Sequence, residues 1–138
     1  MAVRVTGMDK VARNLARELD QIKANSVSGI TKATLYVKAE SQMLAPNRTG
    51  NLMNSAYIRI HQKFRKVVGE VGYNALYAVF VHENPRAGQT GGLSPSGKKY
   101  SDKGGIGWAR TGQWKFLETP LKNTRLILSI IANSMRIR

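Results

Sequence analysis

The stretch YIRIHQKFRKVVGEV, residues 57–71, contains two runs of strand-forming character around a basic turn. Tyr57 to His61 mixes aromatic and β-branched residues with polar ones, and three valines between residues 67 and 71 form the second run. Residues of these kinds favour half-buried strands. Because the polar segment QKFRK separates the two runs, the stretch predicts a β-hairpin and therefore an antiparallel sheet.

Two amphipathic helices are predicted before the hairpin, because apolar residues recur there at three- and four-residue intervals. The first helix begins near residue 8, and the second runs from near Ser26 or Ser28 to Leu44. Pro46 ends the second helix, since the residue before a proline is pushed out of helical geometry. The first apolar stripe consists of Met8, Val11, Ala12, Leu15, Leu19 and Ile22, and the second of Ile30, Ala33, Val37, Ser41 and Leu44.

Further strands and one more helix complete the predicted fold. Residues 2–6 alternate valine with arginine, which favours a short strand. Residues 77–81 favour a third strand, or a short helix that leads into one. The fold class is therefore α+β: an antiparallel sheet of about three to four strands, with two N-terminal helices and one C-terminal helix packed on it. The last helix runs from about residue 119 to 135, with Leu121, Leu128, Ile131 and Met135 on one face.

The chain is expected to form a single domain, residues 1–138. Its 138 residues and 42% hydrophobic content fit one folded unit with its own core. A basic, glycine-rich segment at about residues 84–107 has little periodicity. A patternless segment of this length is too long for an ordinary connection, so we expect a functional or disordered loop.

Composition excludes several classes of protein. The chain has no cysteine, which excludes disulfides, cysteine-based zinc sites and cysteine nucleophiles. Its first residues lack the apolar core of a signal peptide, and no apolar run approaches the length of a membrane span. We therefore expect a product made in the cytoplasm, with no membrane partner.

Charge is the outlying property of this sequence. The 22 Lys and Arg residues against eight acids leave a net charge of +14 and a pI near 10.6. Such an excess is usually held near polyanions or acidic protein surfaces, although a solvated basic surface is the simpler interpretation. The candidate contacts to DNA or to an acidic partner are Arg59, Lys63, Arg65, Lys66, Arg86, Lys98, Lys99, Lys103 and Arg110.

Catalytic motifs are incomplete in this sequence. His82-Glu83 begins like a zinc-peptidase motif, but Arg86 stands where the second histidine is required and Pro85 would break the helix. The eight acids are scattered, and the glycine-rich segment lacks the hydroxyl residue that a phosphate-binding loop needs after its lysine. We predict no catalytic residue, no metal site and no cofactor.

Two places are predicted to contact neighbouring subunits. His82 and Glu83 are expected to mark the end of a strand, with subunit contact as the second interpretation. The last helix carries apolar residues beyond the single face that would cover a small sheet, and this surplus favours a partner subunit. These additional residues are Leu126, Ile127 and Ile130.

Three motifs in a fixed order carry a resemblance to a known family. They are Ala45-Pro46-x-x-Thr49-Gly50-x-Leu52-x-x-Ser55, Tyr77-Ala78-x-x-Val81-His82-Glu83, and Gly112-Gln113-x-Lys115-Phe116-Leu117-Glu118. With the helices and the hairpin around them, they resemble the neck-protein family of long-tailed bacteriophages, also called minor capsid, head–tail joining or tail-completion proteins. The resemblance covers about residues 8–135.

The resemblance implies a structural role in the virion. Such proteins form a ring in the neck, with a hexamer favoured, between the head connector and the tail-terminator or tail-tube proteins, and packaged DNA passes through it. It also implies that residues 77–83 form a core strand and that Phe116 and Leu117 dock the last helix. Relatives have a short link after the strand, whereas this chain inserts residues 84–107.

A second function stays open beside the neck role. The charge, together with aromatic residues near Lys or Arg, also suits a small basic protein that binds nucleic acid without reading its sequence. The basic surface then faces DNA, whereas in the neck it faces either DNA or acidic neighbours. The aromatic residues are Phe64, Tyr100, Trp108 and Trp114.

Overall fold

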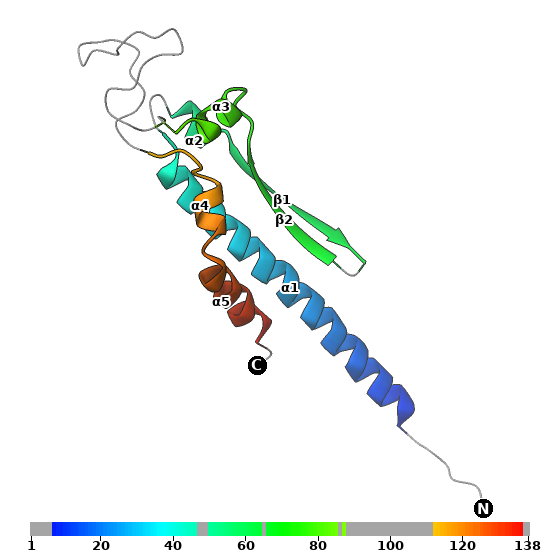
Figure 1. Ribbon diagram of the computed structural model, residues 1–138. Coiled ribbons are helices and arrows are strands. Elements are labelled where there is room, and N and C mark those ends of the chain that lie inside the picture. The colour runs from blue at the N-terminus through cyan, green and yellow to red at the C-terminus, as the bar shows by residue number, and fades with distance from the viewer. Residues whose placement is uncertain (1–6, 47–49, 65, 86, 88–111, 137–138) are drawn as a thin grey trace, which may run out of the picture.

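The computed structural model describes residues 7–46, 50–64, 66–85, 87 and 112–136. Figure 1 shows a long helix, α1, with a β-hairpin along one side and α4 and α5 along the other; α2 and α3 lie near its C-terminal end. The fold is α+β, as predicted. The elements are α1 (Met8–Leu44), α2 (Asn51–Asn54), β1 (Ala56–Lys63), β2 (Lys66–Tyr73), α3 (Ala78–Glu83), α4 (Glu118–Leu121) and α5 (Thr124–Met135).

The two predicted N-terminal helices are one continuous helix of 37 residues, so the prediction of a break near Ser26 or Ser28 was wrong. Ser26 does not cap a new helix; its hydroxyl donates to the carbonyl of Ile22, one turn earlier, at 2.7 Å. Thr31 and Thr34 make the same bond to the carbonyls four residues before them. Hydroxyl side chains that satisfy their own helix in this way do not interrupt it.

The predicted hairpin is present, and its two strands pair antiparallel from Ala56 opposite Tyr73 to Lys63 opposite Lys66. One face of the hairpin packs on α1. Gly69 lies at the closest approach, because a Cβ atom there would overlap the hydroxyl of Thr34. The alternation of strand residues places the opposite face, with Tyr57, Arg59 and His61, toward solvent.

The described residues contain only these two strands, so the predicted count of three to four was wrong. The segment predicted as a third strand, or as a short helix leading into one, is the helix α3, which buries Ala78 and Val81, one turn apart, and exposes Val79 between them. Burial of these two positions in the core outweighs the strand propensity of the segment. The strand predicted at residues 2–6 lies outside the described residues.

The core lies at the C-terminal end of α1 and is small. Its centre is Phe116, which is 1% exposed and makes edge-on contacts with the rings of Tyr73 and His82, each at a centroid distance of 5.1 Å. The buried apolar residues that form this core are Ala45, Leu52, Ala78, Val81, Ala87 and Phe116. Most of the predicted loop at 84–107 lies outside the described residues, but Ala87 within it belongs to this core.

The C-terminal helix is divided into α4 and α5. Its predicted inner face was partly wrong, since Leu128 is exposed while Ile127 lines a hollow beside α1. The contact is set by Gly29 of α1: a Cβ there would stand 3.3 Å from the carbonyl oxygen of Ile131, so only a very small residue lets α5 approach this closely. The apolar residues of α5 itself point to several sides of the helix, so periodicity alone could not identify the side that packs on α1.

Candidate interaction surfaces

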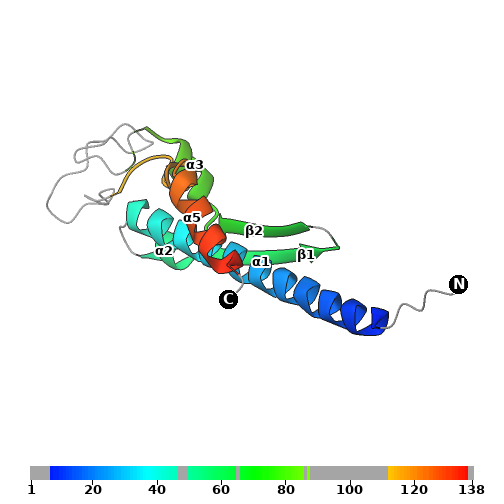
Figure 2. The ribbon, with the colours of Figure 1, turned by 90° about the horizontal axis from the view of Figure 1, so that it is seen from below.

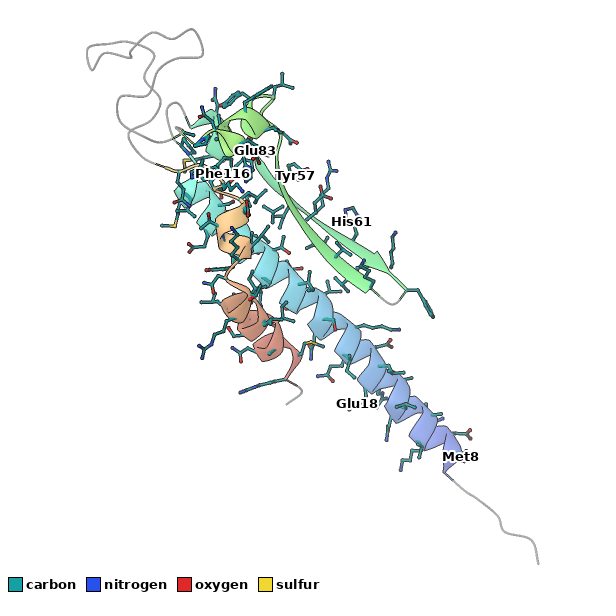
Figure 3. The ribbon with its side chains drawn as sticks, in the orientation of Figure 1. Met8, Glu18, Tyr57, His61, Glu83 and Phe116 are labelled. Carbon is teal, nitrogen blue, oxygen red and sulfur yellow. The ribbon has the colours of Figure 1, made fainter. Side chains whose placement is uncertain are left out.

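The first half of α1 projects beyond the rest of the molecule. We call residues 8–22 the arm; Figures 1 and 2 show it extending past the hairpin and α5 from two directions, and Met8 and Glu18 are labelled on it in Figure 3. Its apolar stripe is exposed along its whole length, from 67% at Met8 to 40% at Ile22. The sequence predicted this stripe as a core face, but within the chain nothing described covers it. The stripe residues are Met8, Val11, Leu15, Leu19 and Ile22.

An apolar groove begins where the arm leaves the body. It follows α1 between β2 and α5 and consists of two adjoining hollows of ≈ 600 and ≈ 400 Å³. Ile30 and Ile131 line both hollows and so mark the middle of the groove. Lys63 and Lys66 form the last pair of the hairpin, at its turn, and there they border both the first part of the groove and the solvent face of the hairpin. The described elements thus leave an apolar channel between β2 and α5 that is partly open to solvent. In a larger domain, a further element would cover such a channel.

The solvent face of the hairpin carries the basic candidates that the structure describes. Arg59 and Lys63 lie on this face of β1, and Lys66 lies opposite Lys63 on β2. Figure 3 shows Tyr57 and His61 on the same side of the hairpin, turned away from α1. The guanidinium of Arg59 lies 4.9 Å from the centre of the Tyr57 ring. We call this surface the basic face.

One carboxylate interrupts the basic face. Glu70 accepts a hydrogen bond from the Tyr57 hydroxyl at 3.0 Å and lies 3.3 Å from Nε2 of His61. The Tyr57 bond, followed by the His61 bond, lowers the pKa of Glu70 below its ordinary value. The carboxylate stays ionised and is paired with His61. Among the described residues of this face, Arg59, Lys63 and Lys66 are therefore the cations available to a polyanion.

His82 and Glu83 belong to a structural joint. Nδ1 of His82 lies 2.7 Å from a carboxylate oxygen of Glu83, and the His82 ring packs edge-on against Phe116. The backbone carbonyl of His82 accepts a hydrogen bond from the amide of Lys115 at 2.8 Å. Nε2 of His82 is buried and finds no hydrogen-bond partner among the described residues. The pair ends a helix rather than the predicted strand, and it holds α3 to the segment that returns from residue 112.

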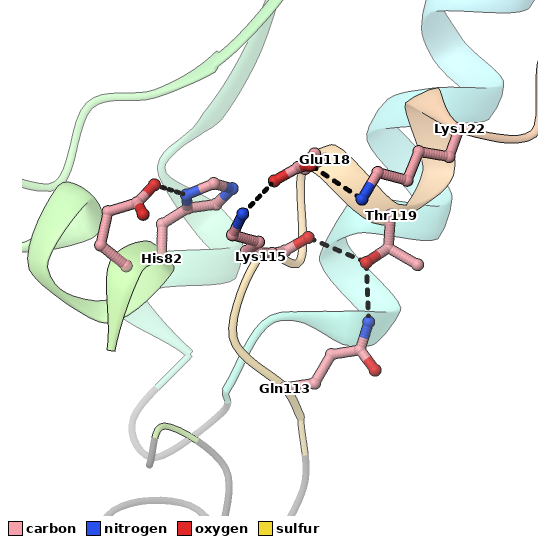
Figure 4. Close-up of polar contacts among 7 residues, drawn as sticks. His82, Gln113, Lys115, Glu118, Thr119 and Lys122 are labelled. Atoms are coloured by element: carbon pink, nitrogen blue, oxygen red, sulfur yellow. Dashed lines mark hydrogen bonds and ion pairs between the residues drawn. The ribbon is translucent and has the colours of Figure 1, made fainter. Parts of the chain in front are cut away.

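That returning segment is held by its own polar network, drawn in Figure 4. Glu118 accepts from Lys115 at 3.0 Å and from Lys122 at 2.8 Å. The Lys122 contact, followed by the Lys115 contact, lowers the pKa of Glu118 to about 2. The hydroxyl of Thr119 donates to the carbonyl of Lys115 and accepts from the side chain of Gln113. This network positions Phe116 in the core and supplies no open site.

A third exposed apolar surface lies on and before α3. Leu76, Val79 and Phe80 have large apolar side chains in solvent, and Phe80 is 77% exposed. The sequence did not single these residues out, because the strand predicted at residues 77–81 placed Val79 and Phe80 in the core. Only the helical period, with Ala78 and Val81 inward, turns Val79 and Phe80 outward.

The structure brings few of the candidate residues together. Of the subunit-contact candidates, Leu126 is exposed, whereas Ile127 lines the groove and Ile130 is half-buried. His82 is partly buried and Glu83 is exposed beside the core. The basic candidates outside the described residues are Arg65, Arg86, Lys98, Lys99, Lys103 and Arg110.

Two further properties of the described residues concern the kinds of site they can form. They contain no group of three His, Cys, Asp or Glu side chains placed to hold a metal ion. Across the same ranges, no helix combines the length and apolar character required to cross a membrane.

In comparisons with known proteins, the chain matches no family model, no curated protein and no solved structure.

Proposed function

We propose that this protein is a structural component of the neck of a long-tailed bacteriophage. Copies of the chain form a ring, with a hexamer favoured, that joins the head connector to the tail-terminator or tail-tube proteins and lets DNA pass. The protein acts by shape and contact, without turnover. It is made in the host cytoplasm and functions in the virion.

The observation that carries this proposal is the amount of apolar surface left in solvent. The arm, the groove and the α3 surface all expose large apolar side chains, while the core of the chain is small. Exposed large apolar side chains that lie next to one another mark sites of protein–protein contact. An assembly subunit that completes its burial against neighbours accounts for all three surfaces.

The convergence of the three sequence motifs in one core also supports the proposal. Ala45 and Leu52 come from the first motif, Ala78 and Val81 from the second, and Phe116 from the third. Motifs that are far apart in the chain thus build one joint, and this joint positions the hairpin and the arm. The basic face then meets phosphate or acidic neighbours without base reading.

The basic face favours a second candidate, a monomeric or dimeric protein that binds nucleic acid without sequence preference. Arg59 lies over the ring of Tyr57, and the ring of Phe64 at the turn is 97% exposed. Proteins that bind single strands combine positive charge with aromatic rings in this way. The two functions differ in assembly. The nucleic-acid candidate gives no role to the arm, whereas the neck candidate requires it.

The test is the mass of the purified full chain, alone and with isolated phage tails, by native mass spectrometry and analytical ultracentrifugation. The neck role predicts a discrete ring-sized oligomer, formed alone or on the tail. A stable monomer that binds DNA tightly and does not bind tails would support the second candidate and reject the first.

A further inference from the structure

We propose that the arm of one copy of this chain lies in the groove of a second copy. The inference rests on the proposed function, because it takes a neighbouring subunit as the occupant of the groove. It names the two surfaces through which neighbouring subunits meet: the apolar stripe of the arm on one copy and the groove on the next.

The stripe on the arm is continuous with a face of α1 that is already an interface. Residues 8 and 44 are separated by ten full turns of an α-helix, so they lie on the same side of α1. The C-terminal half of this side packs on the chain's own hairpin and α5 and buries Ala33, Val37 and Ser41. The N-terminal half has the same apolar spacing and is exposed. This one face of α1 is therefore covered by other elements of the chain over its C-terminal half and exposed to solvent over its N-terminal half.

The arm and the groove match in chemistry, and the open part of the groove is long enough for about half of the arm. The stripe spans Met8 to Ile22, about 21 Å at the rise of an α-helix, and the part of α1 that is at least partly exposed in the groove spans Ile22 to Ile30, about 12 Å. Beyond Ile30 the floor of the groove is covered, because Ala33 and Val37 are buried within the chain. An amphipathic helix that docks by residues spaced three and four apart in an apolar channel is a recurring mode of recognition. Among the described residues, nothing covers the stripe of the arm or the part of the groove beside Ile22, Val27 and Ile30, and both surfaces are apolar.

Charge favours this occupant as well. The chain carries +14, so most pairs of surfaces on two copies repel each other. The arm is an exception, since its three acids, Asp9, Glu18 and Asp20, balance three basic residues. Asp20 lies 3.7 Å from Lys23, but this exposed pair is weak and leaves the acid able to exchange partners. A neutral, acid-containing helix suits a channel that begins beside Lys63 and Lys66.

The arm cannot fill the groove of its own chain. Leu15, at the middle of the arm, and Ile30, at the middle of the groove, belong to one unbroken helix and stand about 22 Å apart along it. A second copy is therefore required. When each copy donates an arm and accepts one, the contact joins two unlike surfaces, which is the kind of interface that closes into a ring.

Disulfide trapping tests the contact directly, because the chain has no cysteine of its own. In Leu15→Cys with Ile131→Cys, one thiol lies at the middle of the arm and the other at the middle of the groove. Ile131 packs beside Gly29, about 21 Å along α1 from Leu15, whereas a disulfide requires Cα atoms within about 7 Å. A bond can then form only between copies. The control Arg13→Cys with Ile131→Cys places the first thiol on the other side of the arm, two residues away.

Mild oxidation of the full chain should give intermolecular disulfides with the Leu15 pair and at least ten-fold fewer with the Arg13 pair. A covalent ladder that extends beyond the dimer supports both the arm–groove contact and the ring. A ladder that stops at the dimer supports the contact, in a reciprocal arrangement, and rejects the ring. An oligomer seen by mass but not trapped by the Leu15 pair rejects the contact and leaves the ring standing.

A variant that cannot disturb the fold keeps the proposal falsifiable if Ile131→Cys fails to fold. Leu15 is exposed in the single chain, so Leu15→Asp should leave its circular dichroism and thermal unfolding unchanged. That comparison is made at a protein concentration at which the wild type is monomeric, because association itself raises Tm. At higher concentration the variant should weaken self-association at least ten-fold by sedimentation. Gln21→Asp introduces the same charge on an exposed side of the arm turned away from the stripe and should have no effect. Equal self-association in both variants would overturn the proposal.

Discussion

At the scale of single residues, two glycines show what a sequence can and cannot reveal. The proline, asparagine and glycine of the segment PNRTG, residues 46–50, predict a turn in which Gly50 has a positive φ or makes a close approach, and its φ of +78° confirms this. Gly69, in contrast, was predicted only as part of a strand. Its role follows from contact with Thr34, 35 positions away along the chain, and no local pattern encodes that contact. Turn chemistry is local and can be predicted, whereas close packing between distant elements cannot.

The Gly50 turn gives the first prediction. Gly50→Val should lower the free energy of unfolding by about 1–2 kcal/mol, because a β-branched residue is strained at this positive φ. Gly50→Asn should reduce the stability less, because asparagine tolerates the left-handed region. Denaturant titration followed by circular dichroism measures both variants. Equal stability of the valine variant and the wild type would contradict the strain at this position.

Glu118 gives a prediction on pH. Contacts with Lys122 and Lys115 lower its pKa to about 2, so its folded-state pKa is depressed. The stabilisation is therefore present above the ordinary carboxyl pKa, roughly 4.3, and is lost as pH falls toward about 2. Glu118→Gln should lower Tm by only roughly 1–3 °C at pH 7, since the pairs are exposed, and by progressively less as the pH falls to 2 and below. Glu40→Gln in α1 is the matched control, and a Glu118 difference that grew in acid would reject the assignment.

At the scale of elements, the sequence predicted helical and strand character more reliably than element boundaries. The inner stripe from Ile30 to Leu44 was correct, since its members are buried or partly buried, whereas the stripe from Met8 to Ile22 was predicted as a core face and is exposed. The serines near residue 26 were taken for a boundary because hydroxyl residues occur both at helix caps and inside helices. The segment 77–81 was ambiguous for a related reason. Its composition favours a strand, but a strand must pair with a neighbouring strand. The tertiary structure shows that this segment instead packs Ala78 and Val81 into the core as a helix.

The helical assignment of α3 can be tested with one matched pair. A strand would place Val79 and Val81 on the same face, whereas the helix buries Val81 and exposes Val79. Val81→Ser should therefore destabilise the fold by at least about 2 kcal/mol, while Val79→Ser should stay within about 0.5 kcal/mol of the wild type. Thermal and denaturant unfolding give both values. Similar destabilisation at the two positions would contradict the helix.

At the scale of the whole molecule, charge and apolar exposure lie in different places. The basic face is on the solvent side of the hairpin, while the uncovered apolar stripe is on the neutral arm. The sequence showed the total charge and the amphipathic pattern but not this separation, because it depends on how the hairpin and α5 pack on α1. A subunit arranged in this way can contact neighbours through the arm and present its cations elsewhere.

The last prediction tests whether the basic face, rather than the net charge, meets phosphate. Replacing Arg59, Lys63 and Lys66 with glutamine should weaken binding to a duplex of arbitrary sequence. It should also reduce the salt dependence of log K by about 1 for each phosphate that the variant no longer neutralises, because fewer counterions are released. Binding should change alike on unrelated sequences, since phosphate contacts carry no base information. Fluorescence anisotropy across a salt series measures both quantities.

A control with the same change of charge separates the two explanations. Replacing Lys10, Arg13 and Arg17 on the arm with glutamine removes three positive charges as well, so both variants fall from +14 to +11. If the basic face binds DNA, the arm variant keeps the wild-type slope and affinity to within about two-fold, while the hairpin variant shows a weaker affinity and a smaller slope. Equal reductions in the two variants would mean that attraction follows the total charge. In that case the hairpin cations serve an acidic protein neighbour or solvation, and the second candidate function loses its site.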